Sequence, residues 1–135
     1  MKELEKKKRI TSFKSIVNPK VMDVLEEKIF QEIVVNKKYK DKTYSAKQLA
    51  IDLGTNTRYI STVINTRFHA NYTTFVNKYR IEEAMKMLKD PRYQDLNVED
   101  IAIMVGFANR QSFYTAFERM NTLTPREYKQ KHIQY

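Results

Sequence analysis

Residues 101–119 read IAIMVGFANRQSFYTAFER, and this stretch predicts two short helices separated by a tight turn. Apolar residues recur at helical spacing before and after the turn, and they are Ile101, Ala102, Val105, Phe113, Ala116 and Phe117. Gly106 is expected to end the first helix, because glycine accepts the left-handed conformation that closes many helices. Asn109 is a good N-cap for the second helix. Together they have the pattern of a helix-turn-helix motif.

The same pattern occurs earlier in the chain. LAIDLG at 49–54 matches IAIMVG at 101–106 at an offset of 52 residues. Beyond the turn the offset is 53, because the second copy has one extra turn residue, and the matching apolar residues are Ile60, Val63 and Ile64. A single copy is also compatible with an ordinary helical hairpin. Two copies with matching glycines, alanines and apolar positions favour paired helix-turn-helix units.

The segment before the first copy predicts another helix. Asn18-Pro19 is suited to begin it, since proline is tolerated in the first helical turn. Its expected apolar face recurs every four residues, at Val21, Leu25, Ile29 and Ile33. A polar break, NKKYKDKTY at 36–44, follows. Ser45 and Gln48 then predict a capping box, in which each side chain binds the other residue's backbone amide.

Between and after the two copies, two more helices are expected. One long helix runs from Thr73 to Lys89 and ends at Asp90-Pro91. Asn97, with Asp100 three residues later, begins the first helix of the second copy. A short terminal helix begins at Pro125.

These elements predict an all-α fold in two similar halves. Residues 1–17 are expected to be a basic linker or tail, without fixed structure. Residues 18–72 form the first helix-turn-helix subdomain and 73–90 the linker helix. Residues 91–135 form the second helix-turn-helix subdomain.

Composition limits the classes of function. The net charge of +9 favours polyanionic partners, although residues 1–20 alone carry seven basic and two acidic side chains, which a solvated tail would equally explain. The chain has no cysteine, and His69 and His132 are its two histidines. We therefore expect no metal, no cofactor and no enzyme activity. The absence of a signal sequence or a long apolar segment favours a cytoplasmic location without membrane contact.

Each second helix carries a polar arc separate from its apolar stripe, given about 100° of rotation per residue. The arcs hold Arg58, Ser61, Thr62 and Asn65 in the first copy, and Arg110, Gln111, Tyr114 and Thr115 in the second. Arginine can bind guanine through two hydrogen bonds, glutamine can bind adenine, and threonine can contact the thymine methyl group. A face that is polar only for solubility is the alternative. Apart from Glu118 at the rim, however, the arcs lack the glutamate and lysine of such faces.

At this point the sequence resembles a known family. SAKQLAIDLGTNTRYISTVI, followed by IAIMVGFANRQSFYTAFERMNTLTPREY, is similar to the AraC/XylS-type DNA-binding domain. The second stretch has the I-A-x-x-x-G-F opening, the F-x-x-A-F core and the closing T-P-x-x-Y of that family. The resemblance covers about residues 20–132. It implies two homeodomain-like helix-turn-helix subdomains joined by a long linker helix. Both recognition helices are then expected in successive major grooves on one side of double-stranded DNA.

The resemblance also implies roles for single residues. The family's base-contacting positions fall on Arg58, Ser61, Thr62, Arg110, Gln111, Tyr114 and Thr115. Positions 62 and 115 are often arginine in relatives, so the relatives' sequence preference cannot be transferred. Further implications are a transcription regulator, activator or repressor, with RNA polymerase as a partner. A separate sensing or dimerisation domain is also implied, to which residues 1–17 would be the linker.

Phosphate contacts are expected from side chains at helix ends or on the terminal helix. These are Ser45, Lys47, Arg67, Asn97, Arg126 and Lys129. A helix-turn-helix module that docks another protein is the competing hypothesis. RNA is a less suitable ligand, because the sequence predicts no β-sheet with exposed aromatic residues.

Overall fold

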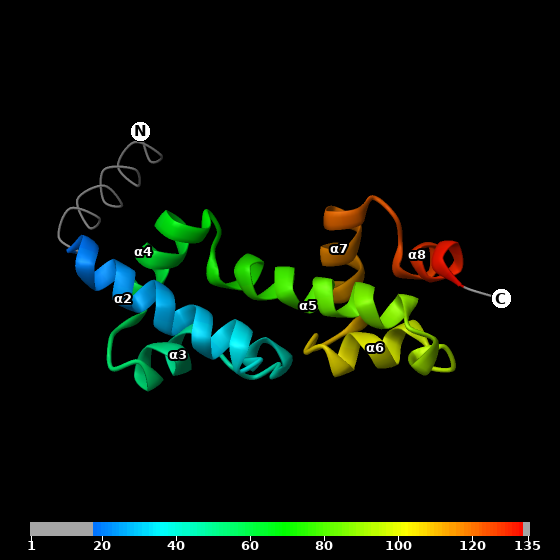
Figure 1. Ribbon diagram of the computed structural model, residues 1–135, viewed down its shortest axis with the longest axis horizontal. Helices are drawn as coiled ribbons and strands as arrows, with labels where there is room; N and C mark the ends of the chain where they lie inside the picture. Colours follow the sequence, from blue (N-terminus) through cyan, green and yellow to red (C-terminus); the bar gives the residue numbers. More distant parts are fainter. Residues whose placement is uncertain (1–17, 134–135) are drawn as a thin grey trace. The chain divides into compact units, whose positions relative to one another are not determined.

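The computed structural model describes residues 18–133, which form seven α-helices and no strand (Figure 1). The helices are α2 (Pro19–Phe30), α3 (Ala46–Asp52), α4 (Thr57–Phe68), α5 (Tyr72–Lys89), α6 (Val98–Met104), α7 (Arg110–Asn121) and α8 (Pro125–His132). Three short turns of other helix types complete them, a π-helix η1 (Gln31–Val35) and two 3-10 helices, η2 (Lys38–Lys40) and η3 (Pro91–Tyr93). The all-α prediction is confirmed. The expected tail at 1–17 lies outside the described residues.

The described chain divides into two compact units. Unit 1 comprises residues 18–36 and 44–75, and unit 2 comprises residues 37–43 and 76–133. Residues 37–43 thus belong to the second unit, although they lie within the stretch that the sequence assigns to the first subdomain. The long helix α5 contributes its first turn to unit 1 and the rest to unit 2.

In unit 1, α2 and α3 both pack against α4 (Figure 1). The fully buried side chains of the unit are Ile29, Ile33, Leu49, Ile60, Val63 and Ile64. The expected apolar face of the first helix was wrong at Val21, which is 44% exposed, whereas Met22 is buried. A four-residue repeat rotates by about 40° at each step, so the four positions span about 120° and Val21 lies at the exposed edge of that arc. The π-helical turn η1 lies where Ile33 rejoins that face.

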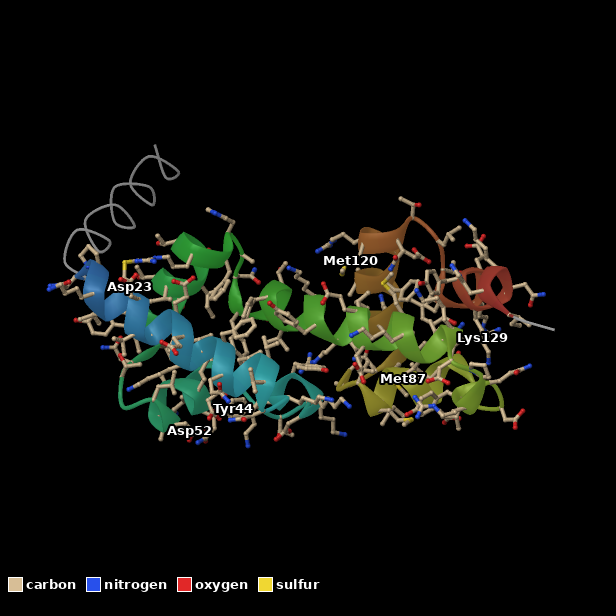
Figure 2. All side chains as sticks on the ribbon, in the orientation of Figure 1. Asp23, Tyr44, Asp52, Met87, Met120 and Lys129 are labelled. Carbon is tan, nitrogen blue, oxygen red and sulfur yellow. The ribbon has the colours of Figure 1, made fainter. Side chains whose placement is uncertain are left out.

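The segment 36–44, expected to be a polar break, contributes two buried tyrosines. Tyr44 belongs to unit 1, where its hydroxyl donates to Asp52 Oδ2 at 2.5 Å and its carbonyl accepts from the Tyr72 hydroxyl at 2.8 Å. Tyr44 and Asp52 lie close together in Figure 2. Burial, and then the hydrogen bond to the Asp52 carboxylate, raise the pKa of Tyr44 above that of an ordinary tyrosine.

Tyr39, the other buried tyrosine, belongs to unit 2. Its carbonyl accepts from Arg80 Nε at 2.6 Å, and the Arg80 guanidinium also lies 5.6 Å from the ring centre of Phe107. Lys40 pairs with Glu83 of α5 at 3.5 Å. These contacts attach the 37–43 segment to α5 and explain why it clusters with unit 2.

Aromatic side chains dominate the core of unit 2. Phe113 and Phe117 of α7 are fully buried, as the sequence predicted. Successive ring centres lie 5.3, 5.6 and 5.4 Å apart along the series Phe107, Phe113, Phe117 and Tyr128. This series runs from the turn before α7 to α8, so it connects the elements that follow α6.

Side-chain caps begin the helices, as the sequence indicated in most cases. Asn56, Asn97 and Asn109 each accept a hydrogen bond from a backbone amide of the helix that follows. The capping box expected at residue 45 forms only in part: Ser45 Oγ accepts from the backbone N–H of Gln48, but the Gln48 side chain donates to Asp52 at 2.8 Å. This bond engages the Gln48 side chain with the carboxylate one turn ahead, so its side chain does not accept from the Ser45 backbone N–H as a capping box requires. A complete capping box joins Thr124 and Glu127 at the start of α8.

We predict that Phe113→Ala destabilises unit 2 by about 3–5 kcal/mol, because it removes a buried aromatic ring and leaves a cavity. Residue-resolved amide hydrogen exchange by NMR would measure the loss in α7. Met120→Ala is the matched control, since Met120 lies on the same helix with 44% of its surface exposed, and it should change stability by less than about 0.5 kcal/mol. Unchanged protection of α7 in Phe113→Ala would contradict the assigned core.

The two glycines should respond unequally to alanine. Both have positive φ, +68° at Gly54 and +111° at Gly106, so either change introduces backbone strain of about 1–2 kcal/mol. A Cβ atom at Gly54 meets nothing within 4 Å, whereas one at Gly106 would collide with the backbone of Tyr39 and Lys40. Gly106→Ala should therefore lower the free energy of unfolding of its unit well beyond the loss in Gly54→Ala. Equal losses by hydrogen exchange would show that the 37–43 segment does not press on Gly106.

Candidate nucleic-acid interface

Each unit contains two helices joined by the same glycine turn. At the end of α3, Thr55 N–H donates to Ala50 O at 2.9 Å and Gly54 N–H to Ile51 O at 3.1 Å. At the end of α6, the corresponding bonds run from Phe107 to Ala102 and from Gly106 to Ile103, at 3.0 and 3.1 Å. This paired pattern is the Schellman ending of a helix, which requires a left-handed residue. The repeat found in the sequence is therefore a repeat of backbone geometry as well.

In unit 1 the second helix of the helix-turn-helix motif is α4, and it presents part of the expected polar arc. Arg58 and Ser61 are exposed. Thr62, which the sequence placed in the same arc, is only 8% exposed, so that expectation of exposure was wrong. Angles around one helix show which side chains share a face, but they do not show how many neighbouring helices cover that face. Because α2 and α3 both pack against α4, its buried sector is wider than the apolar stripe alone indicates.

In unit 2 the second helix of the helix-turn-helix motif is α7, and it presents its polar arc more fully. Arg110, Gln111 and Thr115 are exposed, and Tyr114 is half-buried with its ring edge-on to Phe113 at 5.9 Å. An open polar hollow lies along this helix, lined by Asn77, Asn109, Gln111, Ser112, Thr115, Ala116 and Arg119. Amide, hydroxyl and guanidinium groups thus line one surface, while the opposite side of α7 is held in the core.

Arg110 is held in place by its neighbours. Glu99, in the first turn of α6, lies with Oε1 3.4 Å from Arg110 Nε and 3.0 Å from Arg126 Nη2. The Arg110 guanidinium lies 4.7 Å from the ring centre of Tyr114, and Arg126 Nε donates to the Tyr114 hydroxyl at 3.2 Å. One carboxylate oxygen therefore pairs with two arginines, and both arginines also contact the same tyrosine. We call these four residues the Glu99 network.

The network keeps Glu99 ionised. A hydrogen bond from its own backbone N–H, followed by the hydrogen bond from Arg126, lowers the pKa of Glu99 below the ordinary value for glutamate. The position in the first helical turn acts in the same direction, since the helix dipole favours a negative charge there. The bonds to Glu99 and Tyr114 raise the pKa of Arg126 in turn.

The six expected phosphate-contacting residues fall into different environments. Lys47 is exposed near the start of α3, and the side chains of Ser45 and Asn97 cap α3 and α6. Arg126 belongs to the Glu99 network. The other two have partners inside their own units.

Arg67 pairs with Asp23 and Glu26 at 2.8 and 3.1 Å, so its guanidinium holds the end of α4 against α2. Lys129 Nζ donates to the carbonyls of Gln94 and Leu96, at 3.1 and 2.8 Å, and so anchors α8 to the loop before α6. Figure 2 shows Asp23 on α2 and Lys129 on α8. Arg67 and Lys129 therefore have structural roles that their positions at helix ends did not indicate.

Sequence reasoning missed Glu99 altogether. Its place beside Arg110 depends on how α6 crosses α7, and the ten residues between them in the sequence hide that proximity. One signal was present: at the offset of 52, residue 99 corresponds to Lys47. The two copies therefore differ in charge at one equivalent position.

A family model described as a helix-turn-helix domain matches residues 49–131. The chain belongs to the AraC-type helix-turn-helix family of DNA-binding domains.

Curated relatives agree with this membership. The chain is 27% identical over 84 residues to an uncharacterized HTH-type transcriptional regulator, YtdP, of Bacillus subtilis, covering 62% of this chain and 10% of that protein. It is 25% identical over 93 residues to the HTH-type transcriptional regulator AlkR of Acinetobacter baylyi, covering 69% of this chain and 29% of AlkR. The match thus spans less than a third of these relatives' length.

Solved structures share the fold. The C-terminal domain of AraT, a response regulator from Geobacillus stearothermophilus, matches with a TM-score of 0.73 and 22% identity, over 82% of this chain and 88% of that one. An AraC-type DNA-binding domain protein from Chromobacterium violaceum matches with a TM-score of 0.64 and 17% identity, over 78% and 92% of the two chains. Within residues 18–133, no helix is long and apolar enough to cross a membrane.

We predict that Arg126→Met raises the pKa of Glu99 toward the ordinary value, because one of the two bonds that favour the carboxylate is lost. A carboxylate with a lowered folded-state pKa stabilises the fold above its unfolded-state pKa, and this contribution disappears as pH falls through the folded-state value. The contribution of Glu99 to the free energy of unfolding, which is lost in acid, should therefore be smaller in the variant. A carbon-13 NMR titration of the Glu99 carboxyl group would measure the change in its pKa. The control Arg119→Met changes an exposed arginine of α7 outside the network and should leave the titration unaltered.

Proposed function

We propose that this chain binds double-stranded DNA sequence-specifically, as the DNA-binding part of a transcription regulator, with α4 and α7 in successive major grooves. The observation that carries the proposal is the division of α7. Phe113 and Phe117 are fully buried, while Arg110, Gln111 and Thr115 are exposed on the same helix. An α-helix fits the major groove, and these exposed groups match the donors and acceptors of base edges there.

The proposed base-reading residues follow from exposure and chemistry. In α4 they are Arg58 and Ser61, and in α7 they are Arg110, Gln111, Tyr114 and Thr115. Arg58 and Arg110 suit guanine and Gln111 suits adenine, while the hydroxyl groups suit several bases. Thr62 is not included, because its burial leaves little surface for DNA.

Phosphates would be bound beside these readers. Helix N-termini offer backbone amides and a positive dipole, and Ser45 and Asn97 are the N-cap residues of α3 and α6. Lys47, exposed in the first turn of α3, adds a cation in unit 1. Arg126 would contribute in unit 2 by exchanging its bonds to Glu99 and Tyr114 for a phosphate, whereas Arg67 and Lys129 hold elements of the fold together.

The order of the units suggests the form of the site. Paired recognition helices read half-sites about one helical turn, ~34 Å, apart. Since the two motifs repeat head to tail within one chain, a single chain favours a non-palindromic site. By analogy with its longer relatives, we further propose a separate sensing or dimerisation domain, contact with RNA polymerase, and a cytoplasmic location.

A salt titration tests the proposal against protein docking by the same architecture. Binding to duplex DNA selected from a random library is measured by fluorescence anisotropy at several salt concentrations. A domain that contacts several phosphates loses affinity steeply, by about 0.9 logarithmic units of affinity per phosphate for each tenfold rise in salt. A docking module would bind no duplex, and that result would refute the proposal.

We predict that Gln111→Ala and Arg58→Ala each weaken binding to the selected site by about 1–3 kcal/mol, with little change on random duplex. Each substitution removes base contacts and leaves the fold intact, because both side chains are exposed. Gln130→Ala is the matched control, since Gln130 is an exposed glutamine of α8. It should not change the difference in binding free energy between selected and random duplex. Equal losses on selected and random duplex would refute the base-reading roles.

A further inference from the structure

The charges around Arg110 suggest a role for a residue that does not itself read bases. The proposed reader Arg110 is 61% exposed at its side chain, yet its guanidinium is fixed between the Glu99 carboxylate and the Tyr114 ring. Exposed ion pairs stabilise folds little. Four side chains from α6, α7 and α8 nevertheless converge on this point, so their arrangement needs another explanation than stability.

A carboxylate on a DNA-binding surface also has a cost. Glu99 is 32% exposed at its side chain and lies beside the helix that would enter the groove. There it repels phosphates and occupies two arginines that would otherwise bind them. An arginine that is free to reach phosphates binds every sequence alike, since phosphate contacts carry no sequence information. An arginine held in one direction is available for a base edge.

Unit 1 provides an internal comparison. At the position equivalent to Glu99 it has Lys47, an exposed cation. The same place in the two motifs therefore carries opposite charge. A residue that served only to begin the helix would not require this inversion, because Ser45 and Asn97 cap their helices in the same way.

We propose that Glu99 is a specificity-determining positioning residue, which holds Arg110 against Tyr114 for base reading and keeps Arg110 and Arg126 from binding phosphates indiscriminately. This inference rests on the proposed function. DNA must compete with Glu99 for the two arginines. It would do so successfully only at the correct site, where Arg110 is in register with its base. Both units would then read bases, and unit 1, with Lys47 in place of Glu99, would add phosphate affinity that does not depend on sequence.

The test begins with selection of binding sites from a random duplex library by the wild-type chain of residues 1–135. The same selection with Arg110→Ala identifies the base position that Arg110 reads, as the position where preference is lost. Affinities of each variant for the selected duplex and for random duplex are then measured over a range of salt.

Glu99→Gln should relax preference at the same base position as Arg110→Ala. Its affinity for random duplex should rise, with a salt slope steeper by about 0.9 for each additional phosphate engaged. The ratio of selected to random affinity should fall by about 5- to 150-fold, the discrimination of one good arginine–guanine pair. A purely structural role would weaken both affinities together without changing a single base preference.

Two further variants separate position from charge. Asp100→Asn removes the same charge from the adjacent exposed residue of the same helical turn, and it should leave the affinity ratio and the base preference unchanged. Glu99→Asp keeps the charge but withdraws the carboxylate from Arg110, so it should lower the ratio without steepening the salt slope. Glu99→Asp also gives a readout if Glu99→Gln fails to fold, which thermal melting would reveal.

Two results would overturn the inference while leaving the proposed function intact. One is an unchanged ratio and base preference in Glu99→Gln. The other is an equal effect of Asp100→Asn, which would assign the change to net charge alone. If the wild-type chain selects no sequence at all, the proposed function itself fails, and the inference fails with it.

Discussion

The left-handed backbone conformation at Gly106 is the constraint on which unit 2 depends. It ends α6 with two hydrogen bonds and turns the chain so that α7 can begin four residues later. It also leaves room for the carbonyl of Tyr39, because any side chain at this position would collide with the 37–43 segment. One glycine thus sets the direction of the proposed reading helix and allows a distant segment to pack beneath it.

The second determinant is the division of labour around α7. Its apolar side is fixed by a series of aromatic rings that continues into α8. The polar side is therefore not needed to hold α7 in the core. Arginine is a flexible side chain, so exposure alone does not give it a direction. The Glu99 network supplies that direction through one carboxylate and one ring. Packing therefore orients the helix, and electrostatics orients its arginine.

Much of this could be predicted from local sequence. The glycine turns, the asparagine caps and the burial of Phe113 and Phe117 depend on contacts within one motif, and repetition of the motif strengthened each assignment. The errors have different origins. Val21 was misplaced by the drift of a four-residue repeat along one helix, and the Ser45–Gln48 capping box was incomplete because Gln48 binds Asp52 of the same helix. Only the burial of Thr62 depends on neighbouring helices, since α2 and α3 both pack against α4.

The sequence by itself determined the helices, their ends, the two-fold repeat and the family, because each depends on residues that are neighbours along the chain. Tertiary structure decided which cations face solvent, as Arg67 and Lys129 show by binding partners inside their units. It also decided that residues 37–43 belong to unit 2 and that Glu99 meets Arg110. The physical reason is that an ion pair or a close backbone approach depends on how helices cross, and helical periodicity carries no information about that crossing.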